Sequence, residues 1–332
     1  MKRTSQENFT GKNIIISGGL GFIGSNLAIR LAGLGANVTV IDSLIPEYGG
    51  NLWNVEPVKN KIKINISDVR DEHSMQHLIK DQDYFFNLAG QTSHLDSMKY
   101  PFTDLEINAK AQLSILEVCR KYNPGIKIVF ASTRQIYGKP QYLPVDEKHP
   151  LVPVDVNGIN KLSGEMYHML YNKVYNIKSL VLRLTNTYGA RMRIKDARQT
   201  FLGIWLRNLL EHQPITIFGD GCQLRDYNYI DDVVDAFLVV AGSDKWDGSV
   251  FNLGNDDPIS LQATAELMIE ENNSGRFNFI PFPEELKKID IGDFYSDYGK
   301  IKSIFGWNPK VSNREGFKET IEYFRNNYEY YV

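Results

Sequence analysis

The sequence has little of several things, and each shortage limits what the protein can be. Its two cysteines, Cys119 and Cys222, stand far apart and form no CxxC pair. We therefore expect free thiols in a reducing cytoplasm and no metal site. No apolar run approaches ~18 residues, so no membrane span is expected, and the first residues, MKRTSQENFTGKN, lack the apolar core of a signal sequence. A net charge of -3 gives no basic excess for wrapping a nucleic acid.

The composition is that of a globular protein with a large core. Of the 332 residues, 42% are hydrophobic and 23% are charged. This length is too great for one small core, so we expect either two domains or one domain with a large lobe.

Strand-like and helix-like stretches alternate along the first half of the chain. Short apolar runs lie at 13–17, 37–42, 62–69, 83–90, 127–133 and 179–189. Stretches with helical spacing, such as 25–35 and 107–122, lie between them. This alternation predicts an α/β fold, a Rossmann-type doubly wound parallel sheet. After Gly189 the pattern loosens, which indicates a smaller mixed C-terminal lobe.

A glycine-rich loop, SGGLGFIGSN, follows the first strand and leads into a helix. It contains Gly18, Gly21 and Gly24, and Asp42 ends the second strand 18 residues later. Glycines at this spacing let the backbone approach a pyrophosphate at a helix N-terminus. A carboxylate at the end of the second strand accepts hydrogen bonds from an adenosine ribose and repels a 2′-phosphate. The alternative is a loop-glycine cluster with a capping aspartate, but the matched strand and helix favour a dinucleotide site that prefers NAD to NADP.

These motifs belong to a resemblance that runs nearly from end to end. Its further elements are NLAGQ (87–91), ASTRQIYG (131–138), KLSGE (161–165), LRLTNTYG (182–189), GDGCQLRDYNYIDDVVDAF (219–237) and SIFGWNPKVSNREGFKETIEYF (303–324). The chain resembles the extended short-chain dehydrogenase/reductase family, in its branch of NAD-dependent sugar-nucleotide epimerases and dehydratases. The resemblance implies oxidation of a sugar carbon, usually C4, through a 4-oxo intermediate.

The resemblance also implies a division of the chain and a set of cofactor contacts. Residues 1–189, with 228–256 returning to them, would form the NAD-binding domain, and 190–227 with 257–332 the substrate lobe. Asn108 would lie behind the active site. The implied NAD contacts are Gly18, Gly21, Phe22, Ile23, Gly24, Asp42, Ser43, Asp68, Val69, Leu88, Ala89, Gly90 and Lys161.

The catalytic positions depart from the family pattern at two places. Thr133 fills the family's Ser/Thr position, but Arg134 and Gln135 follow where 4,6-dehydratases carry an Asp-Glu pair. Neither side chain is a carboxylic acid, which argues against 4,6-dehydration. The Thr133 hydroxyl could bond the substrate oxygen that loses a proton. The alternative is a hydroxyl that caps a turn at the end of a strand.

The second departure is at the family's catalytic tyrosine. Asn157 occupies that position, four residues before Lys161. Spacing of four puts both on one helix face, but an amide does not titrate. The proton could then go to Lys161 if its pKa is depressed, to His94 beyond the strand end that borders the nicotinamide in the family, or to a relayed water. The alternative for His94 is a loop histidine bonded to Asp96.

The resemblance assigns the substrate side to Gln91, Thr133, Arg134, Gln135, Asn186 and Arg225. In relatives the positions of Asn186 and Arg225 contact the diphosphate, for which a guanidinium fork is suited. Asp290 stands where relatives often have another arginine, so the nucleotide base stays open. Of the basic residues Arg191, Arg193, Lys195 and Arg198, most are expected to form a solvated face.

Three functions follow as alternatives. The first is a nucleotide-sugar 4-epimerase or 4-dehydrogenase of polysaccharide biosynthesis. The second is a GDP-sugar 4-dehydrogenase, for example on GDP-mannoheptose, that releases the 4-oxo sugar and keeps NADH bound. The third is a dinucleotide-binding protein without catalysis. The resemblance also implies a dimer, because relatives usually dimerise through helices that here would include 107–122 and 158–175. Both stretches carry apolar faces, so we expect a homodimer through a four-helix contact.

Overall fold

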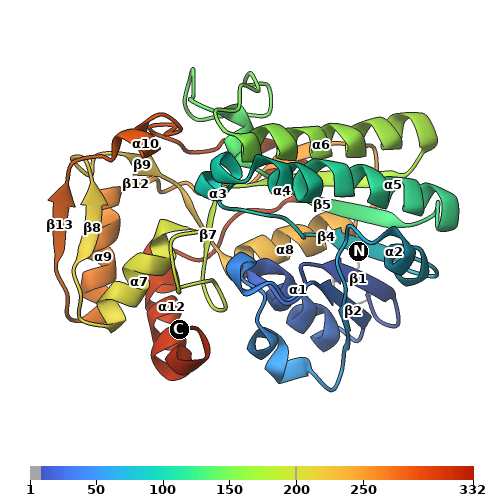
Figure 1. Ribbon diagram of the computed structural model, residues 1–332, viewed down its shortest axis with the longest axis horizontal. Helices are drawn as coiled ribbons and strands as arrows, with labels where there is room; N and C mark the ends of the chain where they lie inside the picture. Colours follow the sequence, from blue (N-terminus) through green and yellow to red (C-terminus); the bar gives the residue numbers. More distant parts are fainter. Residues whose placement is uncertain (1–8, 199) are drawn as a thin grey trace.

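A central parallel sheet organises the protein (Figure 1). The computed structural model describes residues 9–198 and 200–332. Within these ranges, seven strands pair in the order β11-β6-β5-β4-β1-β2-β3, all parallel. They are β1 (Asn13–Ser17), β2 (Asn37–Asp42), β3 (Lys63–Ile66), β4 (Tyr84–Asn87), β5 (Lys127–Thr133), β6 (Lys178–Leu184) and β11 (Val250–Asn252). The predicted Rossmann-type fold is confirmed.

Helices cover both faces of the sheet, which explains why its strands are continuous apolar runs. Ile14 and Ile16 of β1 pack toward one face and Ile15 toward the other. One face carries α1 (Phe22–Gly33) and α8 (Ile230–Ala241). The opposite face carries α2 (Glu72–Leu78), α5 (Ala111–Tyr122) and α6 (Val156–Tyr175), and Figure 1 shows α5 and α6 side by side.

Short elements connect β4 to α5: α3 (His94–Lys99), α4 (Pro101–Leu105) and a π-helical turn (Glu106–Lys110). Elsewhere in the chain lie the 3-10 turns η1 (Pro46–Tyr48), η2 (Leu52–Val58), η4 (Arg134–Tyr137) and η5 (Tyr328–Tyr330). Because parallel strands end at the same edge, α3, η1 and η4 contribute side chains around one opening.

The smaller part of the molecule lies at one end of the sheet (Figure 1). It contains α7 (Phe201–Leu210), α9 (Leu261–Asn272), α10 (Glu284–Lys287) and α12 (Asn313–Asn327). Three two-stranded pairs accompany them: β8 (Ile215–Phe218) with β13 (Phe277–Ile280), β9 (Leu224–Arg225) with β12 (Ile259–Ser260), and β7 (Asn186–Tyr188) with β10 (Tyr227–Tyr229).

Two segments late in the chain return to the sheet. Segment 228–256 supplies α8 and the edge strand β11. Helix α11 (Gly299–Phe305) also lies against β11, where Lys300 Nζ donates to Val250 O over 2.7 Å. The proposed lobe 257–332 therefore contains one helix that packs on the larger part.

None of the helices in the described ranges has the length and apolar character needed to cross a membrane. In the same ranges, no group of three or more His, Cys, Asp or Glu side chains could hold a metal ion.

Candidate functional site

One cavity of about 730 Å³ opens at the carboxyl ends of the strands, between the sheet and the smaller part. Every cofactor, substrate and catalytic residue expected from the sequence lies on its wall. The glycine loop and β2 form one end, and Asn186 and Arg225 belong to the other. The structure thus brings the predicted residues together, while their individual roles stay predictions.

The glycine loop has the geometry of a phosphate cradle. Gly18 has a φ of +66°, and a Cβ on Gly24 would lie 2.2 Å from Gly18 O, so neither position tolerates a side chain. Gly21 precedes α1 without a side-chain cap. The first N–H groups of α1 therefore stay available to an anion, together with the positive end of the helix dipole.

Asp42 combines a structural and a ligand-facing role at the end of β2. Its carboxylate accepts from Leu20 N over 3.0 Å and from Leu44 N over 2.9 Å. Burial raises the pKa of Asp42, and the backbone hydrogen bonds act in the opposite direction. A carboxylate has about four acceptor positions, and the N–H groups of Leu20, Leu44 and Gly21 leave part of them for ribose hydroxyls. These features fit an NAD molecule along this end of the cavity.

Lys161 lies at the middle of the cavity, on α6. Its Nζ donates to Ala131 O over 2.7 Å and lies 4.5 Å from the centre of the Phe130 ring. Burial lowers the pKa of Lys161 to about 8, against the attraction of Asp104 and Glu165. The cation is thus held at the bottom of the cavity, near Gly90.

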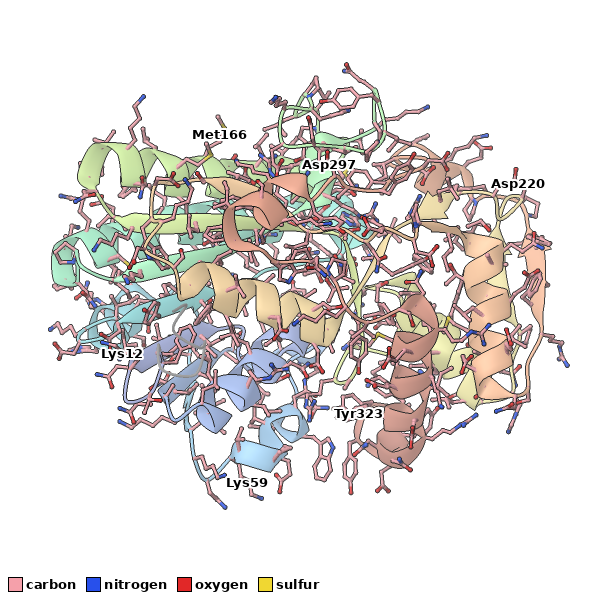
Figure 2. The ribbon with its side chains drawn as sticks, turned by 180° about the vertical axis from the view of Figure 1, so that it is seen from behind. Lys12, Lys59, Met166, Asp220, Asp297 and Tyr323 are labelled. Atoms are coloured by element: carbon pink, nitrogen blue, oxygen red, sulfur yellow. The ribbon has the colours of Figure 1, made fainter. Side chains whose placement is uncertain are left out.

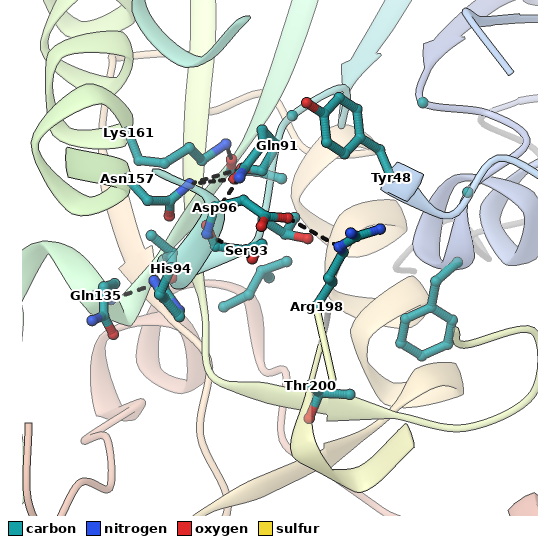
Figure 3. Close-up of a pocket in the computed structure, with 18 of the residues that line it drawn as sticks. Tyr48, Gln91, Ser93, His94, Asp96, Gln135, Asn157, Lys161, Arg198 and Thr200 are labelled. Atoms are coloured by element: carbon teal, nitrogen blue, oxygen red, sulfur yellow. Dashed lines mark hydrogen bonds and ion pairs between the residues drawn. The ribbon is translucent and has the colours of Figure 1, made fainter. Parts of the chain in front are cut away.

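Asn157 is fixed by two acceptors (Figure 3). Its Nδ2 donates to Gln91 O over 2.7 Å and to Asp104 Oδ2 over 3.0 Å. Since both partners can only accept here, the amide nitrogen must face them. The amide oxygen, which has no partner among the described residues and is not shut off from solvent, faces the cavity. Asn157 therefore presents an acceptor that can orient a hydroxyl group but cannot take its proton.

Asp104 is a site residue that the sequence did not indicate. It is fully buried on α4, and its Oδ1 accepts from Asn160 Nδ2 over 2.8 Å. Asn157 and Asn160 are three residues apart on one face of α6, so both amides reach the same carboxylate. That spacing was the only available signal, because the carboxylate itself lies 53 residues earlier.

His94 pairs with Asp155 and not with Asp96. Its Nδ1 lies 2.9 Å from Asp155 Oδ2, although the N–H direction is bent away from this line. Asp96 instead forms an ion pair with Arg198 over 3.1 Å. Figure 3 shows His94 beside Asn157 and Gln135 on the cavity wall.

Asp155 is held from several sides at the start of α6. It accepts from Gly158 N over 2.6 Å and from Gln135 Nε2 over 2.8 Å. Burial raises the pKa of Asp155, but the contact with His94 and these hydrogen bonds outweigh it, so the pKa is lowered overall. The carboxylate is therefore charged and rigid.

Thr133 caps a turn at the end of a strand, which was the second of the two roles considered for it. Its hydroxyl hydrogen remains free. Its Oγ1 accepts from Gln135 N over 3.2 Å at the start of η4. A hydroxyl that accepts one bond can still donate another, so capping and substrate contact are compatible.

Two arginines lie at the substrate end. Arg134 Nη2 donates to Asn186 Oδ1 over 3.1 Å, and its Nη1 is buried without a partner among the described residues. Burial lowers the pKa of Arg134 to about 10, and the nearby Arg225 adds to this. Arg225 donates to Leu224 O over 2.8 Å and lies 3.8 Å from Asp290. Two neighbouring guanidinium groups with incomplete neutralisation suit a diphosphate.

The four basic residues Arg191, Arg193, Lys195 and Arg198 do not act as one cluster at the site. Arg198 alone of the four lines the cavity, where it links to Asp96 (Figure 3). Arg191 bonds Asn54 O and Asn26 Oδ1, both over 3.0 Å, and so holds α1 and η2. Tyr48 of η1 also lines the cavity and, like Arg198, was not among the expected site residues.

Comparison with known proteins gives consistent relatives. Residues 14–254 match the NAD dependent epimerase/dehydratase family. A putative UDP-glucose 4-epimerase of Methanocaldococcus jannaschii is 33% identical over 316 residues, covering 95% of this chain and 99% of that protein. The structure of a UDP-glucose 4-epimerase from Thermotoga maritima with UDP-glucose has a TM-score of 0.87 and 33% identity, covering 95% and 99%. That of the Thermus thermophilus UDP-glucose 4-epimerase with NAD has a TM-score of 0.84 and 28% identity, covering 94% and 99%.

Proposed function

Because this chain belongs to the NAD dependent epimerase/dehydratase family and uses NAD, we propose that it oxidises a nucleotide-linked sugar at C4. The product is either the C4 epimer or the released 4-oxo sugar. The relatives named as UDP-glucose 4-epimerases favour the epimerase outcome. The membership confirms the family resemblance and the cofactor expected from the sequence.

The observation that carries this proposal is the order of groups along one cavity. A phosphate cradle and a ribose carboxylate lie at one end, and Arg134 and Arg225 lie at the other. Between them Lys161, Thr133 and Asn157 converge on the space where a sugar ring would meet a nicotinamide. Bound NAD supplies the hydride acceptor. The protein supplies Lys161 to hold the nicotinamide ribose, and Thr133 and Asn157 to orient the sugar hydroxyl.

The two side chains after Thr133 oppose a 4,6-dehydratase reaction. The Gln135 amide is bonded to Asp155, and Arg134 is bonded to Asn186. Neither is a carboxyl group, and water loss from a sugar needs an acid and a base at this position. The site is therefore proposed to stop at C4 oxidation or to return the hydride.

The proposal is tested by mixing the purified protein with NAD and a panel of UDP-, GDP-, CDP- and dTDP-sugars. The cognate compound should produce the near-ultraviolet absorbance of NADH, transiently for an epimerase and persistently for a dehydrogenase. Chromatography of the sugar product then distinguishes the two. A protein that binds NAD but gives neither absorbance change nor product with any member would instead be a binding protein.

A further inference from the structure

We propose that the imidazole of His94, held by Asp155, accepts the hydroxyl proton during sugar oxidation. This inference rests on the proposed function. It also explains how a site with asparagine at position 157 can carry out the reaction without the tyrosine that the family resemblance implies there.

The two nitrogens of His94 have different surroundings. Nδ1 is buried and lies 2.9 Å from Asp155 Oδ2, an ion-pair contact without the full geometry of a hydrogen bond. The side chain as a whole is 41% exposed and lines the cavity. Nε2 has no hydrogen-bond partner among the described residues and is not closed off from solvent, so it is the nitrogen available on the cavity side. In a neutral imidazole whose Nδ1–H is directed at a carboxylate, Nε2 carries no proton and can accept one.

Asp155 suits the role of a positioning residue. It is only 2% exposed and is fixed by Gly158 N and Gln135 Nε2. A fixed carboxylate selects the tautomer of its imidazole partner and stabilises the imidazolium that forms when the ring takes a proton. Since Asp155 also caps α6, the helix that carries Asn157 and Lys161, it ties the base to the rest of the site.

The other nearby groups are less suited to take the proton. Asn157 does not titrate, and its nitrogen is used by Gln91 and Asp104. Lys161 Nζ already donates to Ala131 O at the bottom of the cavity, where it is proposed to hold the nicotinamide ribose. The Thr133 hydroxyl can relay a proton but cannot retain one.

In the proposed step a hydride leaves C4 for the cofactor and a proton leaves the C4 hydroxyl for His94. The C4–H bond breaks and its hydride passes to NAD⁺, which is reduced to NADH. The O–H bond breaks and its proton passes to Nε2 of His94, while a carbonyl group forms at C4. The imidazolium remains paired with the Asp155 carboxylate until the reverse transfer or until release of the proton to solvent.

The test is single-turnover NADH formation by His94→Ala with the sugar nucleotide that reacts with the wild-type protein. We expect a rate loss of ~10²-fold or more, with unchanged affinity for NAD and for the sugar nucleotide measured by calorimetry. Added imidazole should restore the rate in proportion to its concentration. His77→Ala, an exposed histidine on α2, is the control and should behave as wild type.

Asp155→Asn tests the positioning role without removing the helix cap, because asparagine also caps helices well. We expect kcat to fall ~10-fold or more with KM unchanged, whereas Asp71→Asn, at the cap of α2, should change neither. A His94→Ala rate within threefold of wild type, or a loss that imidazole fails to restore, would overturn the proposal. If wild type itself forms no NADH with any sugar nucleotide, the proposed function has failed instead.

Discussion

At the scale of single residues, Asn157 is a side chain that cannot titrate and is held in place on the cavity wall. Its amide nitrogen joins Gln91 of the loop after β4 to Asp104 of α4. Only a side chain with a donor at this distance satisfies the Asp104 carboxylate from this direction. The groups around this position therefore match the donors of an asparagine amide.

Replacing Asn157 by tyrosine tests this directly. Asn157 is 3% exposed, so the larger ring must displace its neighbours, and Asp104 loses one of its two amide donors. We expect a loss of about 1–3 kcal/mol in the free energy of unfolding and no gain in single-turnover NADH formation. Urea unfolding and stopped-flow absorbance measure the two effects. Lys173→Tyr, exposed on the same helix, is the control, and a large rate gain in Asn157→Tyr would mean that the site had only lost its base.

Lys161 gives a prediction with a defined pH dependence. Burial lowers its pKa to about 8 in the folded protein from 10.5. Between these values the unfolded chain binds more protons, so this lysine makes the free energy of unfolding rise with pH. Below pH 8, burying the charged Lys161 lowers the free energy of unfolding by its full amount. That amount is on the order of 3 kcal/mol, because one pKa unit corresponds to about 1.4 kcal/mol.

Lys161→Met should therefore be more stable than wild type at pH 7, and this advantage should shrink as the pH rises from about 8 toward 10.5. Urea unfolding of the cofactor-free proteins at several pH values measures it, with Lys61→Met as the exposed control. An equal stability difference at pH 7 and at high pH would contradict a depressed pKa for this lysine.

At the scale of elements, the parts of the site that could be predicted are those encoded locally. Gly18, Gly21 and Gly24 follow a strand and open a helix, and Asp42 ends the next strand, so a few adjacent residues specify the cradle. Strand β11 was not predicted, because its three residues are too few to show a period. It is identified only by its pairing with β6.

Contacts between distant elements could not be predicted in the same way. The sequence suggested Asp96 as the partner of His94 because it is two residues away, but in α3 that side chain turns toward Arg198. The actual partner, Asp155, precedes α6 and reaches His94 only because α3 packs on α6. Asp104 meets Asn157 for a similar reason, since α4 also packs on α6.

The short strands β9 and β12 position Arg225, and this leads to a kinetic prediction. The antiparallel pair holds Arg225 opposite Ile259, and Arg225 lines the cavity. If it contacts the diphosphate, Arg225→Ala should raise the KM of the sugar nucleotide ~10-fold or more while kcat changes much less. Arg207→Ala, on α7 and outside the cavity lining, is the control. A change confined to kcat would place Arg225 at the reacting carbon.

At the scale of the whole molecule, an apolar surface runs over the helices beside the site. Exposed apolar side chains lie on α6 at spacings that form one stripe, and on α3 and α4 next to it. They are Ile159, Met166, Leu170, Val174, Leu95, Met98, Phe102 and Leu105. Figure 2 shows Met166 on the outer side of α6. Such a patch on a helical face suits a second copy of the chain.

We therefore expect wild type to sediment as a dimer at micromolar concentration. The double variant Met166→Lys/Leu170→Lys should sediment as a monomer, because each lysine places a charge in the apolar contact. Ile304→Lys, on the exposed side of α11, is the control and should stay dimeric. A wild type that is monomeric at this concentration would rule out the four-helix contact.

The most direct test of C4 oxidation follows the hydride itself. The cognate sugar nucleotide is prepared with deuterium at C4 and mixed with the NAD-loaded protein. During the first turnover the cofactor is released from the protein, and its mass is measured by mass spectrometry. We predict that the reduced cofactor carries the deuterium, and that the rate of its formation falls when deuterium replaces hydrogen at C4. A reduced cofactor without deuterium, or with deuterium only when C3 or C6 is labelled, would contradict it.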